Sequence, residues 1–124
     1  MKILLTGPNG FVGSRILNMY RNDIIPAPSL RDASEDYVRK VIEESGADAI
    51  IHTAAISDTR TCQNNPDLSY RANVTLPVML AHAARGRKLI CFSSDQVYTG
   101  CNSEGSYVEE DAVPGNIYAD HKLE

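Results

Sequence analysis

The chain has 124 residues, of which 43% are hydrophobic and 23% are charged, a composition typical of one globular domain with one hydrophobic core. Its formal net charge of −4 argues against nucleic acid or an anionic membrane as the main partner. The apolar start at residues 3–5 is followed at once by Thr6 and Gly7, so it is too short for a signal peptide or a membrane span.

Short apolar runs alternate with segments of helical spacing along the chain. We expect strands at residues 3–5, 24–25, 49–52 and 89–92. We expect helices from Phe11, between a Ser34 cap and Gly46, from Pro66 with a kink or a loosening at Pro77, and near Tyr118 after a polar loop at 99–110. This alternation predicts an α/β fold, a Rossmann-type doubly wound parallel sheet with helices on both faces, truncated after about four strands. In such sheets ligands bind beyond the carboxyl ends of the strands.

The segment TGPNGFVG joins the first predicted strand to the first predicted helix and places glycines at a GxxGxxG spacing. Gly7 permits a tight turn, Gly10 lets backbone approach a pyrophosphate, and Gly13 lets the helix pack closely on the sheet. The pyrophosphate would lie on the N–H groups at the start of the helix. A turn that serves packing alone is the alternative. The residues expected to bind the dinucleotide here are Gly7, Asn9, Gly10, Phe11, Val12 and Gly13.

No acidic residue stands at the tip of the second predicted strand, where dinucleotide-binding domains commonly place one for the ribose. Arg31 follows the strand, and an arginine there can pair with the 2′-phosphate of NADP. Two interpretations stay open. Either Arg31 binds this phosphate, which favours NADP over NAD, or it is a solvated loop charge.

Three cysteines, Cys62, Cys91 and Cys101, form no CxxC pair. Scattered cysteines in odd number are typical of reduced thiols in a cytoplasmic protein. We therefore expect a cytoplasmic location and no metal site.

Four motifs occur in order: TGPNGFVG, HTAA after the third predicted strand, SSDQVYTG after the fourth, and YADHK at residues 118–122. With them the chain resembles the extended short-chain dehydrogenase/reductases of the NAD-dependent epimerase/dehydratase superfamily, most closely the dTDP-4-dehydrorhamnose reductase branch. The resemblance covers residues 1–124, which correspond to the first part of such an enzyme.

The resemblance implies that Thr53, Ala54 and Ala55 line the adenosine and ribose of the cofactor and that Asn73 is structural. His52 stands where the family often has Asn, and we interpret it as a hydrogen-bonded histidine at a strand end rather than a catalytic one.

The catalytic residues of the family correspond to Ser94, Tyr118 and Lys122, of which Tyr118 and Lys122 also contact the cofactor. Hydride transfer to a carbonyl carbon leaves an alkoxide, which needs a proton from an acid within reach. A phenol has an ordinary pKa of about 10, and a neighbouring ammonium group stabilises its phenolate form. Tyr118 and Lys122 are four residues apart, so one helix presents both on one face, while Ser94 can polarise the same carbonyl.

Position 96 separates related reactions. Dehydratases of this fold resemble STDE here, whereas this chain has Ser93, Ser94, Asp95 and Gln96. Gln96 cannot abstract a proton, which disfavours dehydration. The reductase branch often has an aromatic residue at this position, so Gln96 departs from that pattern too and leaves the substrate open.

We therefore expect an NAD(P)-dependent reductase of a nucleotide-linked 4-keto-sugar, with Tyr118 as the acid. An NAD-dependent sugar-nucleotide epimerase and a non-catalytic NAD(P)-binding regulatory subunit are the alternatives. The oligomeric state stays open, a homo-oligomer included. Residues 1–124 supply an incomplete dinucleotide-binding domain without a substrate domain, so we expect this segment alone to be inactive.

Overall fold

The structure is a computed structural model that describes residues 1–100 and 107–124. The chain divides into two compact units, one comprising Met1–Ala55 and Thr75–Phe92, the other Ile56–Val74 and Ser93–Glu124. Cys101 and residues 101–106 of the predicted loop at 99–110 lie outside the described residues.

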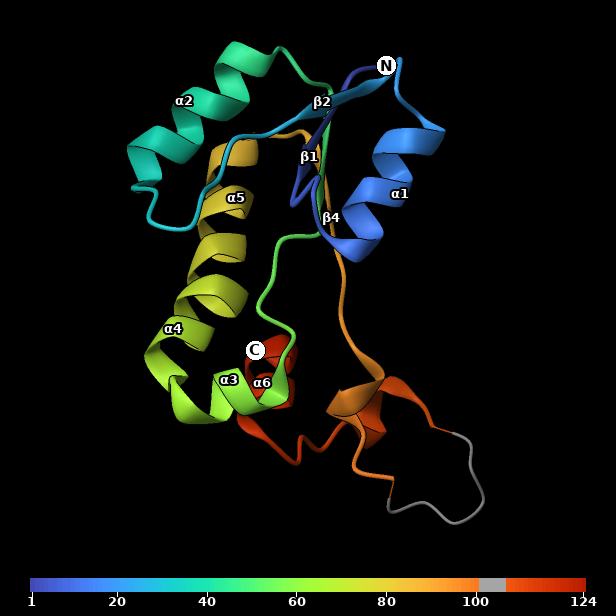
Figure 1. Cartoon of the computed structure of the whole chain (residues 1–124), viewed down its shortest axis with the longest axis vertical. Helices are drawn as coiled ribbons and strands as arrows, with labels where there is room; N and C mark the ends of the chain where they lie inside the picture. Colours follow the sequence, from blue (N-terminus) through green and yellow to red (C-terminus); the bar gives the residue numbers. More distant parts are fainter. Residues whose placement is uncertain (101–106) are drawn as a thin grey trace. The chain divides into compact units, whose positions relative to one another are not determined.

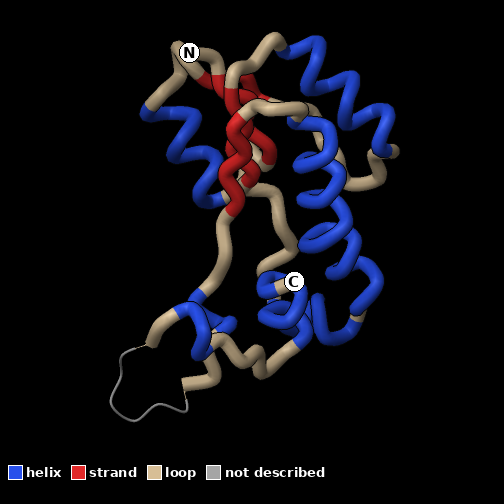
Figure 2. Tube along the Cα trace, turned by 180° about the vertical axis from the view of Figure 1, so that it is seen from behind, coloured by secondary structure: helices blue, strands red, loops and turns tan. Residues whose placement is uncertain are grey.

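The first unit is built on a parallel sheet. Its four strands are β1 (Ile3–Thr6), β2 (Ile24–Pro26), β3 (Ala49–His52) and β4 (Lys88–Cys91), in the order β2-β1-β3-β4. Figure 2 shows the strands in red. The order reverses at β1, which pairs with β2 on one side and with β3 on the other. Doubly wound sheets bind ligands at such a reversal. The predicted Rossmann-type fold is confirmed, although β4 begins and ends one residue earlier than expected.

Helices cover both faces of this sheet. α1 (Phe11–Met19) lies on one side, while α2 (Glu35–Ser45) and α5 (Leu76–Ala84) lie on the other, in contact with each other (Figure 1). Their apolar sides enclose a core whose central members, each at most 1% exposed, are Leu4, Val38, Ile42, Ile50 and Leu80. Burial of each such side chain contributes roughly 1.5–3 kcal/mol, so this core is the main source of stability in the first unit.

The ends of α2 follow from local sequence. At its start, the Ser34 hydroxyl accepts the Tyr37 N–H at 3.2 Å. At its end, Gly46 takes a left-handed φ of +63°, a conformation that a glycine adopts without steric cost. Both boundaries are as predicted.

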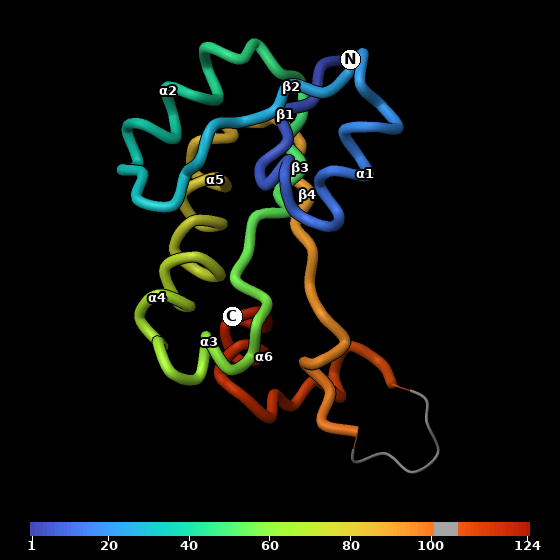
Figure 3. The backbone as a smooth tube through the Cα atoms, viewed as in Figure 1, coloured from blue at the N-terminus to red at the C-terminus, as the bar shows by residue number. Residues whose placement is uncertain are grey.

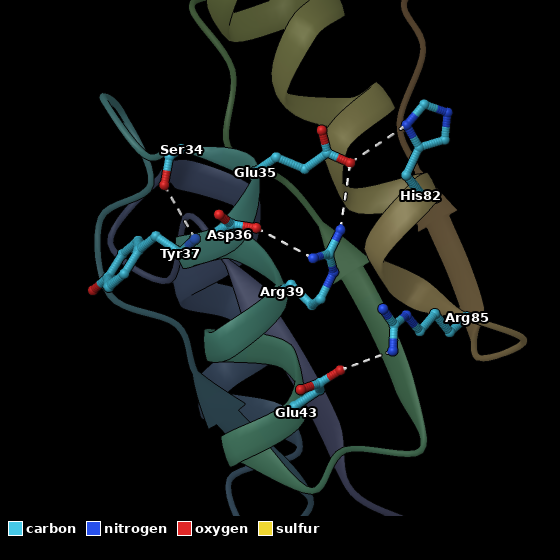
Figure 4. Close-up of polar contacts among 8 residues, drawn as sticks. All are labelled: Ser34, Glu35, Asp36, Tyr37, Arg39, Glu43, His82 and Arg85. Atoms are coloured by element: carbon cyan, nitrogen blue, oxygen red, sulfur yellow. Dashed lines mark hydrogen bonds and ion pairs between the residues drawn. The ribbon is translucent and has the colours of Figure 1, made fainter.

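Exposed ion pairs join α2 and α5. Glu43 lies 3.3 Å from Arg85, and Glu35 lies 3.9 Å from His82, which forms an ion pair only when the histidine is protonated (Figure 4). Arg39 adds contacts within α2, to Glu35 and Asp36. Exposed pairs of this kind contribute at most about 1 kcal/mol each, so they supplement the apolar core.

The helix predicted from Pro66 is divided in the structure. α4 (Pro66–Tyr70) begins at Pro66 as expected, a π-helical segment η1 (Arg71–Thr75) follows, and α5 starts next. Pro77 lies in the first turn of α5, directly after this segment, so the loosening expected near Pro77 takes the form of a π-helical segment. Proline lacks an N–H and its ring clashes with the carbonyl four residues earlier; the wide π turn ahead of Pro77 relieves both problems.

The second unit consists of short helical elements. They are α3 (Thr59–Asn64), α4, η2 (Asp95–Val97), η3 (Glu109–Asp111) and α6 (Ile117–Leu123). α6 contacts α3, α4 and η2 (Figure 3). The sequence did not predict α3, although Asp58, which caps it, is a recognisable start signal. Across residues 1–100 and 107–124, no helix has the length and apolar character needed to cross a membrane.

Candidate cofactor and catalytic sites

The glycine turn between β1 and α1 is tight. Gly7 has a φ of +68°, and its carbonyl oxygen accepts the Gly10 N–H at 3.1 Å. A Cβ on Gly13 would overlap that carbonyl oxygen, so only a glycine lets α1 pack this closely on the turn. The packing roles expected of Gly7 and Gly13 are therefore visible in the structure.

The N-terminus of α1 is suited to an anion. Gly10 is its N-cap, and within the described residues no side chain caps this end and no acidic residue lies in the first turn. The first N–H groups of a helix have no partner inside it, and they carry the positive end of the helix dipole. A Cβ on Gly10 would meet Gly7 O at 3.4 Å, an ordinary contact, and among the described residues no other atom, apart from those of the adjacent residues, lies within 4 Å of that position. The space in front of the turn is therefore open. Phosphate binding fits this geometry.

The carboxyl ends of β1 and β3 are tied together behind the turn. Thr6 and His52 are register partners, both buried, and Thr6 Oγ1 lies 2.6 Å from His52 Nδ1. The Thr53 hydroxyl donates to Thr6 O at 2.7 Å and lies 3.2 Å from Gly7 O. The interpretation of His52 as a hydrogen-bonded strand-end histidine is confirmed. The contact of Thr53 with the glycine turn was not foreseen, because it depends on strand register.

Arg31 lies in the loop between β2 and α2, beside an open pocket. The pocket is lined by Ser29, Arg31, Asp32, Ala33, Ser34 and Tyr37. The Ser34 hydroxyl is already used as the cap of α2. The charged side chains that line the pocket are those of Arg31 and Asp32. Arg31 can attract a phosphate in this pocket, whereas Asp32 would repel it.

The three predicted catalytic residues all belong to the second unit, and the glycine turn, Arg31 and residues 53–55 belong to the first. Tyr118 and Lys122 lie on α6, and Tyr118 is buried. Ser94 caps η2, where its hydroxyl accepts the Gln96 N–H at 3.2 Å. Because η2 contacts α6, the segments that carry Ser94 and Tyr118 are neighbours.

Gln96 has a structural partner. Its side-chain oxygen accepts an N–H of Asn116 at 3.4 Å, and the Asn116 oxygen in turn caps α6 by accepting the Ala119 N–H at 2.8 Å. The residue that departs from the dehydratase pattern therefore contacts the cap of the helix that carries Tyr118. Neither Asn116 nor its link to Gln96 was predicted.

Polar contacts surround the other end of α6. The Tyr70 hydroxyl donates to Glu124 at 3.0 Å, and this hydrogen bond, with the charge of Glu124, raises the pKa of Tyr70 above its ordinary value.

Asn73 forms hydrogen bonds with both the N–H and the carbonyl oxygen of Ile56, which confirms its structural role. Cys62 is a buried thiol close to the same carbonyl. In the described parts of the chain, no group of three or more His, Cys, Asp or Glu side chains could hold a metal ion.

Comparison with known proteins agrees with this geometry. A dTDP-4-dehydrorhamnose reductase of Shigella flexneri is 30% identical over 99% of this chain and 44% of that protein. The methionine adenosyltransferase 2 subunit beta of Danio rerio is 30% identical over 99% of this chain and 42% of that protein. A crystal structure of dTDP-4-dehydrorhamnose reductase from Bacillus anthracis str. Ames in complex with NADP superposes with a TM-score of 0.87 at 28% identity, over 98% of this chain and 47% of that chain.

The chain therefore spans less than half the length of these relatives. The family described as RmlD substrate binding domain matches residues 1–124, the full extent of the sequence. The chain belongs to the RmlD substrate binding domain family.

Proposed function

We propose that the protein containing this chain is an NAD(P)-dependent reductase of a nucleotide-linked 4-keto-sugar, acting in the cytoplasm. The observation that carries the proposal is the grouping of Ser94, Tyr118 and Lys122 on η2 and α6, in a chain of this family. Relatives named dTDP-4-dehydrorhamnose reductase support the substrate class.

The glycine turn fits a dinucleotide. Its pyrophosphate would lie on the first N–H groups of α1, at residues Gly10–Gly13, in the space that the absence of a Cβ on Gly10 leaves open. Thr53, Ala54 and Ala55 follow the neighbouring strand and would line the adenosine and ribose. Arg31 favours NADP, and the Bacillus anthracis relative was crystallised with NADP. When bound, the reduced nicotinamide supplies the hydride.

Residues of the second unit supply the proton that the carbonyl oxygen of the substrate takes up. As hydride reaches the carbonyl carbon, the Tyr118 hydroxyl donates its proton to the carbonyl oxygen, so that an alcohol and not an alkoxide leaves the site. Lys122, one helical turn further along α6, stabilises the phenolate that remains. Ser94 donates a hydrogen bond to the same oxygen and polarises the carbonyl.

A second candidate is a cofactor-binding subunit of another enzyme. The observation that favours it is the 30% identity to a protein named methionine adenosyltransferase 2 subunit beta. Such a subunit would use the glycine turn of the first unit and would not need Tyr118 or Lys122 to act on a substrate.

The test uses the whole protein that contains residues 1–124, because this chain spans less than half the length of the relatives. Purified protein is mixed with NADPH and a nucleotide-linked 4-keto-sugar, and NADPH absorbance is followed. We expect stoichiometric loss of NADPH and formation of the alcohol. Binding of NADPH without turnover would favour the subunit. Inversion at C4 of a 4-hydroxyl nucleotide-sugar in a parallel sample with NAD, without net change in the cofactor, would favour an epimerase.

A further inference from the structure

Asn73 uses its whole side-chain amide. Its oxygen accepts the Ile56 N–H at 3.2 Å, and its nitrogen donates to Ile56 O at 3.0 Å and to Ser69 Oγ at 3.2 Å. Asn73 is only 5% exposed. It therefore fixes the backbone directly after the HTAA segment to the buried hydroxyl of Ser69.

The Ser69 hydroxyl also forms a hydrogen bond with a residue of α6. This fully buried hydroxyl lies 2.8 Å from Nδ1 of His121. Because an Asn73 N–H already donates to this oxygen, the hydroxyl hydrogen can be donated to Nδ1. The ring of Tyr70 meets the His121 ring edge-on, with centroids 5.2 Å apart and planes at 85°. The orientation of the His121 ring is therefore set by a hydrogen bond and by an aromatic contact.

His121 lies between Tyr118 and Lys122 on a helix of seven residues. A helix this short is not stable by itself, so its rotation and position depend on tertiary contacts. Asn116 holds the first turn of α6, and His121 holds the last turn through Ser69. A small rotation of α6 would move the Tyr118 hydroxyl and the Lys122 ammonium together.

We propose that Asn73, Ser69 and His121 form a hydrogen-bonded relay that positions α6, so that His121 is a positioning residue for proton transfer by Tyr118. This inference rests on the proposed function. It assigns a task to the histidine of the YADHK segment, for which the sequence motif requires none.

The experiment compares two variants of His121 in the whole protein. His121→Leu removes the polar atom that faces Ser69, whereas His121→Asn keeps a polar atom near the place of Nδ1. Because misplacement of a reacting group by about 1 Å can cost up to 10²-fold in rate, we expect kcat of His121→Leu to fall roughly 10- to 100-fold. We expect His121→Asn to stay within about threefold of wild type, and the NADPH dissociation constant to be unchanged in both.

Ser69→Ala is the second variant, because it removes one buried oxygen with little change in volume. It should lower kcat at least as much as His121→Leu does, because it removes both the contact with His121 and the acceptor of the Asn73 N–H. The double variant should be no worse than Ser69→Ala alone, since the two substitutions break the same Ser69–His121 contact. The matched control is His82→Leu on α5, whose side chain is 68% exposed, and which should leave kcat unchanged.

A kcat of His121→Leu and Ser69→Ala equal to wild type, measured where both are fully folded, would overturn the relay. A loss of kcat shared equally by His121→Asn would overturn it too, because the hydrogen bond would then not be the cause. Tyr118→Phe is measured alongside. If it loses turnover while His121→Leu does not, the relay fails and the proposed reductase stands. If Tyr118→Phe keeps full turnover, Tyr118 is not the acid and the relay fails with it, whereas absence of turnover in the wild type would contradict the proposed function itself.

Discussion

Each of the two units of the chain is stabilised internally by a different kind of interaction. In the first, parallel strands and a core of aliphatic side chains such as Leu4, Ile50 and Leu80 support a turn whose shape is set by backbone. In the second, short helices enclose buried polar side chains, Ser69 and Asn73 among them, that bond one another. Cofactor binding should therefore tolerate most side-chain changes outside the glycines, whereas the chemistry should depend on individual side chains.

Apart from the loss of the Tyr118 hydroxyl, the largest effect is expected in the second unit, at Lys122. Lys122→Met removes the charge that we propose assists Tyr118 in proton transfer, so kcat should fall roughly 10²-fold at neutral pH. Lys122→Arg keeps the charge and should lose less. A kcat of Lys122→Met equal to that of wild type would show that the charge is irrelevant.

The glycine turn offers a matched pair in the first unit. In Gly13→Ala the new methyl group would overlap the Gly7 carbonyl, a backbone atom that cannot move aside, and the free energy of unfolding should drop by about 2 kcal/mol. Gly10→Ala places its methyl group at an ordinary 3.4 Å from the same carbonyl, and we expect a change within about 0.5 kcal/mol. Urea denaturation measures both. Equal midpoints would mean that α1 is not packed on the turn as described.

Cofactor choice should depend on the pocket beside α2. Arg31→Ala should weaken NADPH by about 1.5 kcal/mol, the scale of a charge-assisted contact, and leave NADH nearly unchanged. Asp32→Asn removes a like charge from the same pocket and should tighten NADPH. Calorimetry with both cofactors decides between the two interpretations of Arg31, because equal effects on NADPH and NADH would make it a loop charge only.

The smallest effect is expected for the ion pairs on the surface of the first unit. Arg85→Ala removes the ion pair with Glu43 (Figure 4). The side chain of Arg85 is 59% exposed and that of Glu43 is 49% exposed. The loss of unfolding free energy should stay below about 0.5 kcal/mol and should vanish at 1 M salt. A loss that persists at high salt would point to packing by the arginine stem instead.

Sequence reasoning succeeded where structure follows from local pattern. The strand positions, the Ser34 cap, the left-handed Gly46 and the glycine turn all follow from residue types within a few positions of one another. It failed where structure depends on contacts distant in sequence. The hydrogen bond between Ser69 and His121 joins positions 52 residues apart, and no local pattern announces it.

The short elements show the same limit. α3 has six residues, too few for a helical period to emerge, and only its Asp58 cap could have indicated it. The helix from Pro66 was predicted at the correct start and with a kink or loosening at Pro77, but periodicity could not predict that the loosening takes the form of a π-helical segment before the proline. In this chain, the cofactor turn was the predictable part and the packing around Tyr118 was not.

The most direct test of the account is Tyr118→Phe in the whole protein, with NADPH binding and turnover measured on the same sample. The substitution keeps the buried ring and removes the proton donor. We predict an NADPH dissociation constant within about twofold of wild type and a kcat lower by about 10²–10⁴-fold, the usual contribution of general acid catalysis. Turnover equal to that of wild type would contradict the claim that the first unit binds the cofactor while the second carries the chemistry.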